Sequence, residues 1–232
     1  MLQVYLEEIV LYKLPFVTAA IFFVGLFYRI YKYLSVKLRV FPVFPKASKS
    51  GLEKLFEYFS DVFLFKTIFS SDKFLWVLSW LFHVSLFVIL LGHLRMFLGI
   101  KVDENFTSFL GTLLGVIFFL TLLSLLVRRV AKLRVISTAE DYFALILLLS
   151  VAISGMYLRL NDVSLNGYLL SLISGEKIVV GSSALVVHAL LAQILVAYLP
   201  FGKLFHSIGV FHSNYLVRWK NARVRSSVRE VR

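Results

Sequence analysis

Cysteine is absent from this sequence of 232 residues. Its absence excludes disulfide bonds, iron–sulfur clusters bound by the chain itself, and thiolate ligands for haem or zinc. Charge is also scarce, because 16% of the residues are charged, against about 25% in soluble domains. Hydrophobic residues make up 59%, and the mean hydropathy is +0.86. The composition indicates an integral membrane protein, in which any redox centre needs histidine or methionine ligands.

Acidic residues are few, 13 against 25 basic ones, which gives a net charge of +12. In a soluble chain this excess would suggest a nucleic-acid partner. Here the basic residues lie between apolar runs, where the positive-inside rule and anionic lipids account for them. We therefore expect a lipid environment and no nucleic-acid partner.

Four runs without a charged residue are each long enough to approach or cross a hydrocarbon core of about 30 Å as a helix. They are residues 74–94, 105–127, 142–158 and 178–202. A fifth candidate span comes first, over residues 9–33, with Lys13, Arg29 and Lys32 near its ends expected to reach the lipid headgroups. Acidic Glu7 and Glu8 precede it where a signal peptide would be basic, so we expect the segment to be retained. The predicted fold is an all-α integral membrane protein, a five-transmembrane-helix bundle in a single domain over residues 1–232.

Loop charges predict the orientation of the bundle. Lysine and arginine number eight in residues 32–73, four in 128–141 and seven in 203–232, but only two each in 95–104 and 159–177. Loops rich in these residues are expected on the cytoplasmic side. The N-terminus is then outside and the C-terminus cytoplasmic, in a multi-pass protein of a prokaryotic cell membrane.

The predicted cytoplasmic loop over residues 40–72 contains a helical pattern. Ser50 and Glu53 form a capping-box signature, after which apolar residues recur at helical spacing opposite charged ones. The apolar positions are Leu52, Leu55, Phe56, Phe59 and Phe63. We interpret this as an amphipathic helix on the inner membrane surface, which either packs and contacts lipid or provides a platform for a soluble partner.

Four of the five histidines fall in two pairs, and we predict that they hold two haem irons. His83 and His93 lie ten residues apart on the second span, whereas His188 and His206 lie eighteen apart on the last. These spacings rise about 15 Å and about 27 Å on a helix, and eighteen residues return to nearly the same azimuth. Because the two spans run in opposite directions, His93 meets His188 near the outer face and His83 meets His206 near the inner face. Haem needs only two axial ligands per iron.

Two other interpretations of the histidines remain. They are either hydrogen-bonding residues in a helix interface, or ligands of a zinc or di-iron site. The second needs three or four ligands at one depth with carboxylates nearby, and no acid lies inside these runs. The fifth histidine, His212, follows the last span and is expected at the interface.

Residues near the outer ends of the spans are candidate contacts for a quinone or for haem propionates. They are Gly92, Arg95, Lys101 and Arg159. The basic ones also fit simple interface anchors, and Gly92 also fits a tight helix crossing. Gly111 and Gly115 form a Gly-x-x-x-Gly pattern, at which another helix can pack.

Several motifs resemble a known superfamily over essentially the whole chain. WLFHVSLFVILLGH, which ends at His93, and HALLAQILVAYLPFGKLFH, from His188 to His206, resemble the second and fifth helices of the gamma-subunit cytochromes b of respiratory nitrate reductases. Arg128-Arg129 followed by STAED up to Asp141 is similar to the loop into that family's fourth helix. FPVFP in the first loop, GHLR at Gly92, the short 101–104 loop and GMYLR at 155–159 are closer to the membrane cytochromes of sulfate reducers, in sulfite-reduction-linked and heterodisulfide-reductase-like complexes.

This resemblance implies a di-haem b subunit that exchanges electrons between menaquinol and a cytoplasmic iron–sulfur subunit. It also allows further membrane and periplasmic subunits in the same complex. It implies no catalytic residues apart from the electron-transfer ligands. In nitrate reductases a lysine after the second span helps to bind quinol, but the shortened loop here departs from that pattern at Lys101. The alternatives are a nitrate reductase gamma subunit, or a structural anchor without full haem content.

Overall fold

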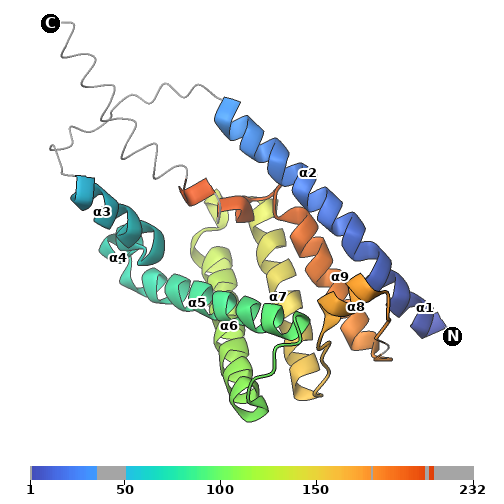
Figure 1. Ribbon diagram of the computed structural model, residues 1–232. Helices are drawn as coiled ribbons and strands as arrows, with labels where there is room; N and C mark the ends of the chain where they lie inside the picture. The colour runs from blue at the N-terminus through green and yellow to red at the C-terminus, as the bar shows by residue number, and fades with distance from the viewer. Residues whose placement is uncertain (1, 36–50, 179, 207–208, 212–232) are drawn as a thin grey trace, which may run out of the picture.

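The computed structural model describes residues 2–35, 51–178, 180–206 and 209–211, and all regular secondary structure in these ranges is helical. The longer helices form one bundle (Figure 1). In chain order the elements are α1 (Leu2–Glu8), the π-helical η1 (Ile9–Lys13), α2 (Leu14–Ser35), α3 (Gly51–Phe63), α4 (Lys66–Ser71), α5 (Lys73–Phe97), α6 (Glu104–Lys132), the 3-10 turn η2 (Arg134–Ile136), α7 (Ala139–Leu160), α8 (Tyr168–Ser174), α9 (Ser183–Tyr198) and the 3-10 turn η3 (Lys203–Phe205).

Among the described residues, four helical segments are long and apolar enough to cross a membrane: the continuous run Gln3–Ser35, then α5, α6 and α7. They correspond to the first four predicted spans. Helix α5 packs on α6, α6 on α7, and α7 on α9, while α2 returns to pack on the far side of α9. Each helix after α4 therefore lies beside its neighbour in sequence, apart from the short α8, which contacts the end of α5.

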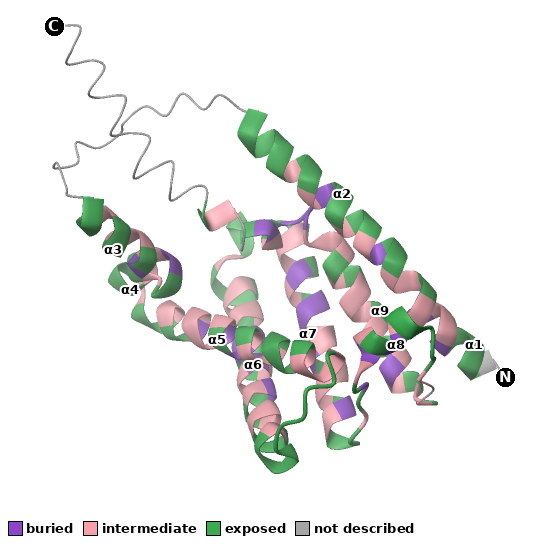
Figure 2. Cartoon of the chain, in the orientation of Figure 1, coloured by how far each residue is buried: buried purple, intermediate pink, exposed green. Residues whose placement is uncertain are grey.

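Large apolar side chains cover the outside of the bundle, where Figure 2 shows mainly intermediate and exposed residues. Phe23, Phe87 and Phe109 are 52%, 62% and 68% exposed. The interior between α5, α6 and α7 is a small cluster: Phe82, Phe118, Leu122, Leu148 and Ala152. A helix satisfies its own backbone hydrogen bonds, so such an apolar surface is stable in hydrocarbon.

Loop carboxylates determine where two of the spans begin. Asp72 Oδ1 accepts a hydrogen bond from Leu75 N at 2.9 Å at the start of α5, and Asp103 Oδ1 accepts one from Phe106 N at 2.7 Å at the start of α6. The Leu75 N–H and the guanidinium of Arg128, 3.3 Å away, lower the pKa of Asp72 from its ordinary value. Both carboxylates satisfy N–H groups that a helix start leaves without partners.

The last predicted span, over residues 178–202, is wrong in length. Helix α9 covers only Ser183–Tyr198, which is 16 residues. Ser182 starts it by accepting a hydrogen bond from Leu185 N at 3.3 Å, and Pro200, which has no N–H to continue the ladder, follows its end. The sequence pattern missed these boundaries because both flanking stretches are as apolar as the helix.

The ending of α9 also overturns the expected geometry of its two histidines. His188 lies on α9, but His206 follows the 3-10 turn η3. The segment from His188 to His206 is therefore not one helix, and the expected rise and common azimuth of the two histidines are wrong. The position of His206 is instead decided by the turn between Tyr198 and Lys203.

The π-helical turn η1 lies near the start of the first span and has side-chain partners on two other helices. Gln193 of α9 donates to Val10 O at 2.7 Å, and Tyr168 of α8 donates to Leu11 O. The altered hydrogen-bond ladder of a π-turn leaves carbonyls available for such partners. Burial raises the pKa of Tyr168 to about 12, so its phenol keeps the proton that it donates. These bonds hold α8 over the end of the bundle where α5 ends and α9 begins.

Helix α3 lies at the opposite end, beside the start of α5 (Figure 1). Its apolar residues point outward: Leu52, Phe56, Phe59 and Phe63 are 80%, 71%, 49% and 55% exposed. Ser60 and Val62 are buried. Ser50 of the expected capping box, and the part of the 40–72 loop before it, lie outside the described residues.

Candidate haem-binding histidine pairs

The structure brings the four intramembrane histidines together as two pairs. The rings of His93 on α5 and His188 on α9 have centroids 6.2 Å apart and planes at 25°. The rings of His83 on α5 and His206 after η3 have centroids 6.0 Å apart and planes at 84°. Both pairs thus join α5 to the α9–η3 segment. His212 lies outside the described residues.

These separations fit two imidazoles on opposite sides of one metal ion. Two metal–nitrogen bonds of about 2 Å in line place the ring centres about 6 Å apart. Helices α5 and α9 are not among the closely packed helix pairs of the described chain. Within the same residues, no group of three or more His, Cys, Asp or Glu side chains could hold a metal ion. The donor set therefore fits an ion that needs two protein ligands, such as haem iron.

Backbone hydrogen bonds leave the Nε2 atoms of three histidines available for a metal. Nδ1 of His83 lies 2.7 Å from Ser79 O, Nδ1 of His93 lies 2.8 Å from Ile89 O, and Nδ1 of His206 lies 3.0 Å from Lys203 O. A carbonyl only accepts, so Nδ1 must carry the proton in each ring. The unprotonated nitrogen is then Nε2, and the carbonyl also fixes the ring orientation, as in many metal sites.

His188 differs from the other three, because its partner is a side chain on another helix. Its Nδ1 lies 2.9 Å from Ser154 Oγ of α7. That hydroxyl also lies 2.9 Å from Ser150 O, which takes its proton, so Oγ accepts the Nδ1–H of His188. At Gly155, an added Cβ would lie 3.1 Å from the His188 ring. Ser154 and Gly155 were not predicted as partners of His188, although their small size in an apolar span was a signal.

For a haem held by His93 and His188, replacing Ser154 by alanine should raise the reduction potential. A hydrogen bond from Nδ1–H raises the basicity of the ligand and favours ferric iron, so its loss favours ferrous iron. A hydrogen bond of about 1 kcal/mol corresponds to roughly 40 mV for a one-electron couple, which sets the size of the shift. Redox titration of the haem spectrum measures it. Ser150→Ala, one turn earlier on α7, is the matched control and should leave both potentials unchanged; equal shifts in both variants would contradict the assignment.

The segment that ends at His206 is held by Arg29 of α2. Arg29 donates from Nε to Pro200 O at 2.8 Å and from Nη2 to Phe201 O at 2.9 Å. Its guanidinium also lies 5.6 Å from the centre of the Phe205 ring. The sequence pattern predicted that Arg29 reaches the lipid headgroups. In the structure it donates hydrogen bonds to carbonyls of the turn after α9.

The first turn of α7 holds the other side of the same turn. Glu140 Oε1 accepts from Lys203 N at 2.7 Å and from Tyr198 OH at 3.1 Å. Asp141 accepts from Lys203 Nζ at 2.8 Å and pairs with Arg129 at 2.9 Å. The RR…STAED motif noted in the sequence thus contributes to the placement of His206.

An aromatic residue of unusual conformation also borders the inner pair. Phe65 has a positive φ of 50°, a left-handed conformation that bulky residues rarely adopt. Its ring lies 5.0 Å from that of His83, and the Phe82 ring lies 4.8 Å from His83 on another side. Nothing in the sequence pattern identified Phe65.

The four candidate quinone or propionate contacts do not form one pocket. Arg95 donates to Ile100 O at 3.0 Å, and Lys101 is exposed in the loop. Arg159 donates to Thr107 O, and a Cβ at Gly111 would lie 3.2 Å from its Nη2. The Nε of Arg159 is buried with no hydrogen-bond partner in the described structure. A Cβ at Gly92 would meet nothing within 4 Å, so a tight helix crossing does not explain this glycine.

Comparison with known proteins supports one of the two resemblances seen in the sequence. No protein-family model matches the chain. It is 27% identical over 252 aligned positions to the Hdr-like menaquinol oxidoreductase cytochrome b-like subunit of Archaeoglobus fulgidus, covering 86% of this chain and 76% of that protein. It is 28% identical over 258 positions to the subunit of the same name from Archaeoglobus profundus, covering 88% and 77%. These names agree with the heterodisulfide-reductase-like resemblance and not with the nitrate reductase one. Together with its four apolar helices, the similarity indicates a membrane protein.

Proposed function

We propose that this chain is the di-haem b subunit of a menaquinol-linked, heterodisulfide-reductase-like respiratory complex. The observation that carries the proposal is the pairing of four histidines, each with Nδ1 hydrogen-bonded, at ring separations of 6.0 and 6.2 Å. His93 and His188 hold one haem b, and His83 and His206 hold the other. The names of the two archaeal relatives support the quinol and the type of complex.

Each haem supplies a one-electron redox centre when it is bound. The chain supplies the axial nitrogens, fixes their tautomer through Nδ1, and surrounds the sites with apolar helices that exclude water. Arg95 and Arg159 lie near the outer ends of their helices and Lys101 lies in the loop after α5, and we assign all three to the propionates of the outer haem. Arg159 has an unpartnered Nε for this purpose.

The same proposal includes the five-span topology. Helix α9 is 16 residues long and, with the apolar segments on both sides of it, forms the fifth span. The N-terminus is outside and the C-terminus is in the cytoplasm, as the loop charges favour. Quinol oxidation near the outer pair, with electrons carried inward and protons left outside, then contributes to the membrane potential.

The visible spectrum of the purified subunit tests this function directly. Two b-type haems per polypeptide are expected, both reduced by dithionite and both six-coordinate in the ferric state. Haem extraction and quantification against protein concentration gives the ratio. A colourless protein with intact helical circular dichroism would instead identify a structural anchor and overturn the proposal.

An iron–sulfur partner is expected at the inner end of the bundle, because a chain without cysteine cannot extend the electron path by clusters of its own. The η2 turn projects there, with Val135 99% exposed and Ile136 75% exposed beside exposed Lys132 and Arg134. The absence of native cysteine makes a single introduced thiol unambiguous.

Val135→Cys should cross-link to the iron–sulfur subunit in the assembled complex, and an impermeant maleimide should fail to label it in intact cells. Ile100→Cys, 53% exposed at the outer end, is the matched control and should be labelled from outside. Mass spectrometry identifies both products. The opposite labelling pattern would show that the orientation is reversed.

A further inference from the structure

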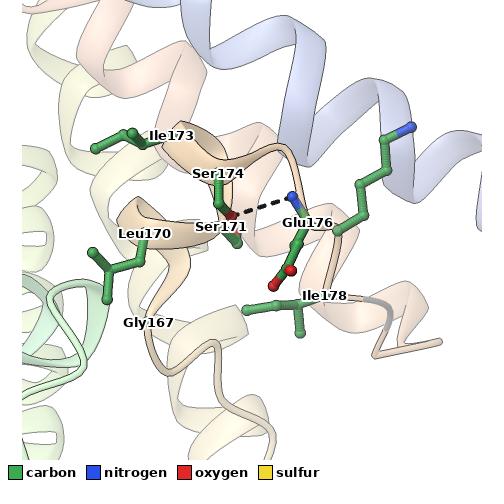
Figure 3. A pocket seen from close by; sticks show the side chains of 8 residues that line it. Gly167, Leu170, Ser171, Ile173, Ser174, Glu176 and Ile178 are labelled. Atoms are coloured by element: carbon green, nitrogen blue, oxygen red, sulfur yellow. Dashed lines mark hydrogen bonds between the residues drawn. The ribbon is translucent and has the colours of Figure 1, made fainter.

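A hollow of about 530 Å³ lies between α8 and the turn that follows it, near the end of the bundle that holds His93 and His188 (Figure 3). Leu170, Ile173 and Ile178 are its apolar side chains, and Leu170 is 59% and Ile173 84% exposed. Ser171, Ser174, Glu176 and Lys177 add polar groups. The hollow is open on one side, and its volume lies in the range of small-molecule sites.

A chain of aromatic contacts connects the hollow to the outer histidine pair. Ser171 Oγ, which lines the hollow, lies 3.4 Å from Tyr12 OH, and the Tyr12 ring lies 6.0 Å from that of Tyr168. The Tyr168 ring lies 5.4 Å from the Phe97 ring, which in turn lies 6.0 Å from His93. Three aromatic rings, those of Tyr12, Tyr168 and Phe97, therefore lie in succession between the hollow and His93.

Glu176 provides a carboxylate on the same hollow. Figure 3 shows the side chains of Glu176 and Ile178 extending into the space beside α8. Glu176 is exposed, and its carboxylate makes no hydrogen bond or ion pair within the described part of the chain. The adjacent Lys177 is already paired with Glu8, at 3.0 Å. The carboxylate oxygens of Glu176 are thus available to a ligand in the hollow.

We propose that this hollow is the quinol-oxidation site and that Glu176 is its general base, an inference that rests on the proposed function. The ligand is a para-quinol with an apolar tail, of the menaquinol class. The carboxylate of Glu176 takes the proton of one quinol hydroxyl and releases it to the outer water. The second hydroxyl proton leaves directly to water at the open side. The two electrons pass one at a time toward the ferric haem held by His93 and His188, and the quinone leaves to the lipid.

The hollow offers what the outer cationic residues do not. Arg95 and Arg159 are engaged with backbone carbonyls of their own chain, and neither they nor Lys101 can accept a proton while charged. A quinol that is oxidised must lose two protons, and Glu176 is the carboxylate among the residues that line the hollow.

Glu176→Gln tests the proton step. In the assembled complex, or in the haem-loaded subunit, we expect reduction of the haems by menadiol, a short naphthoquinol, to slow about 100-fold, the usual loss for a general base. Reduction by dithionite and haem content should be unchanged. Glu104→Gln, an exposed acid at the start of α6, is the matched control and should reduce at the wild-type rate. An E176Q protein that menadiol reduces as fast as wild type would overturn the role of Glu176.

Photolabelling with an azido-naphthoquinone tests the location without depending on turnover. Trypsin cleaves after Arg159 and Lys177, so the residues of the hollow up to Lys177 fall in one peptide, 160–177. The label is expected there, competed by menadione and lost in Ser174→Trp, which fills the hollow. Label in peptide 96–101, or elsewhere on the bundle, would show that the site is not this hollow. If only the proposed quinol site is wrong, the protein still shows two haems in its visible spectrum. If the proposed function is wrong, the protein contains no haem.

Discussion

Replacing His188 by alanine should reduce the haem content from two per chain to one. His188 and His93 face each other at a ring separation of 6.2 Å, whereas the other pair shares no residue with them. Loss of one axial ligand should therefore release the outer haem and leave the inner haem six-coordinate. Haem quantification, with redox titration of the remaining band, measures the outcome.

The reciprocal variant makes this expectation specific. His206→Ala should lose the haem that His188→Ala retains, so the two variants should show single haems of different potential. His212→Ala, which alters a histidine outside both pairs, should keep both haems. If His188→Ala and His206→Ala lose the same haem, the pairing by depth is incorrect.

Replacing Arg29 by glutamine should weaken binding of the inner haem roughly 10- to 100-fold, the usual cost of losing a group that orients a metal ligand. Arg29 makes no contact with the histidines themselves. It donates to Pro200 O and Phe201 O and lies over Phe205, and these contacts fix the turn that carries His206. Partial loss of the inner haem, with the outer haem intact, is expected in the purified protein.

Two further variants separate this positioning role from charge and from general destabilisation. Arg29→Lys keeps the charge but not the planar fork, so it should lose inner haem as Arg29→Gln does. Lys32→Gln, one turn later and exposed, should keep both haems. Equal loss of both haems in Arg29→Gln would mean that Arg29 supports only the fold.

The apolar runs and the spacing of the histidines were enough to predict much of the fold and of the candidate site. Helices α5, α6 and α7 fall where the uncharged runs predicted them, because hydropathy over a membrane-length window is a local property of the chain. Membrane depth follows from the position along each span. The partners His93 with His188, and His83 with His206, were therefore expected before their distances were known.

The boundaries of the last helix could not be obtained in this way. Residues 180–182 and 199–202 are uncharged, yet they lie outside α9. Before α9, Gly181 has a positive φ of 67°. After α9, the carbonyls of Pro200 and Phe201 receive hydrogen bonds from Arg29, which lies more than 170 positions away in sequence. Such long-range hydrogen bonds leave no periodic signal in the sequence.

What the sequence by itself determined was the lipid solvent, the helical class and the grouping of the histidines into two pairs, since these depend on composition and on spacing along the chain. What only the tertiary structure decided was the partner of each side chain: Ser154 for His188, Arg29 for the turn before His206, and the aromatic path from α8 to His93. These contacts depend on how each helix is rotated about its axis and where it ends. Both are decided by packing between segments distant in the chain, which no local pattern records.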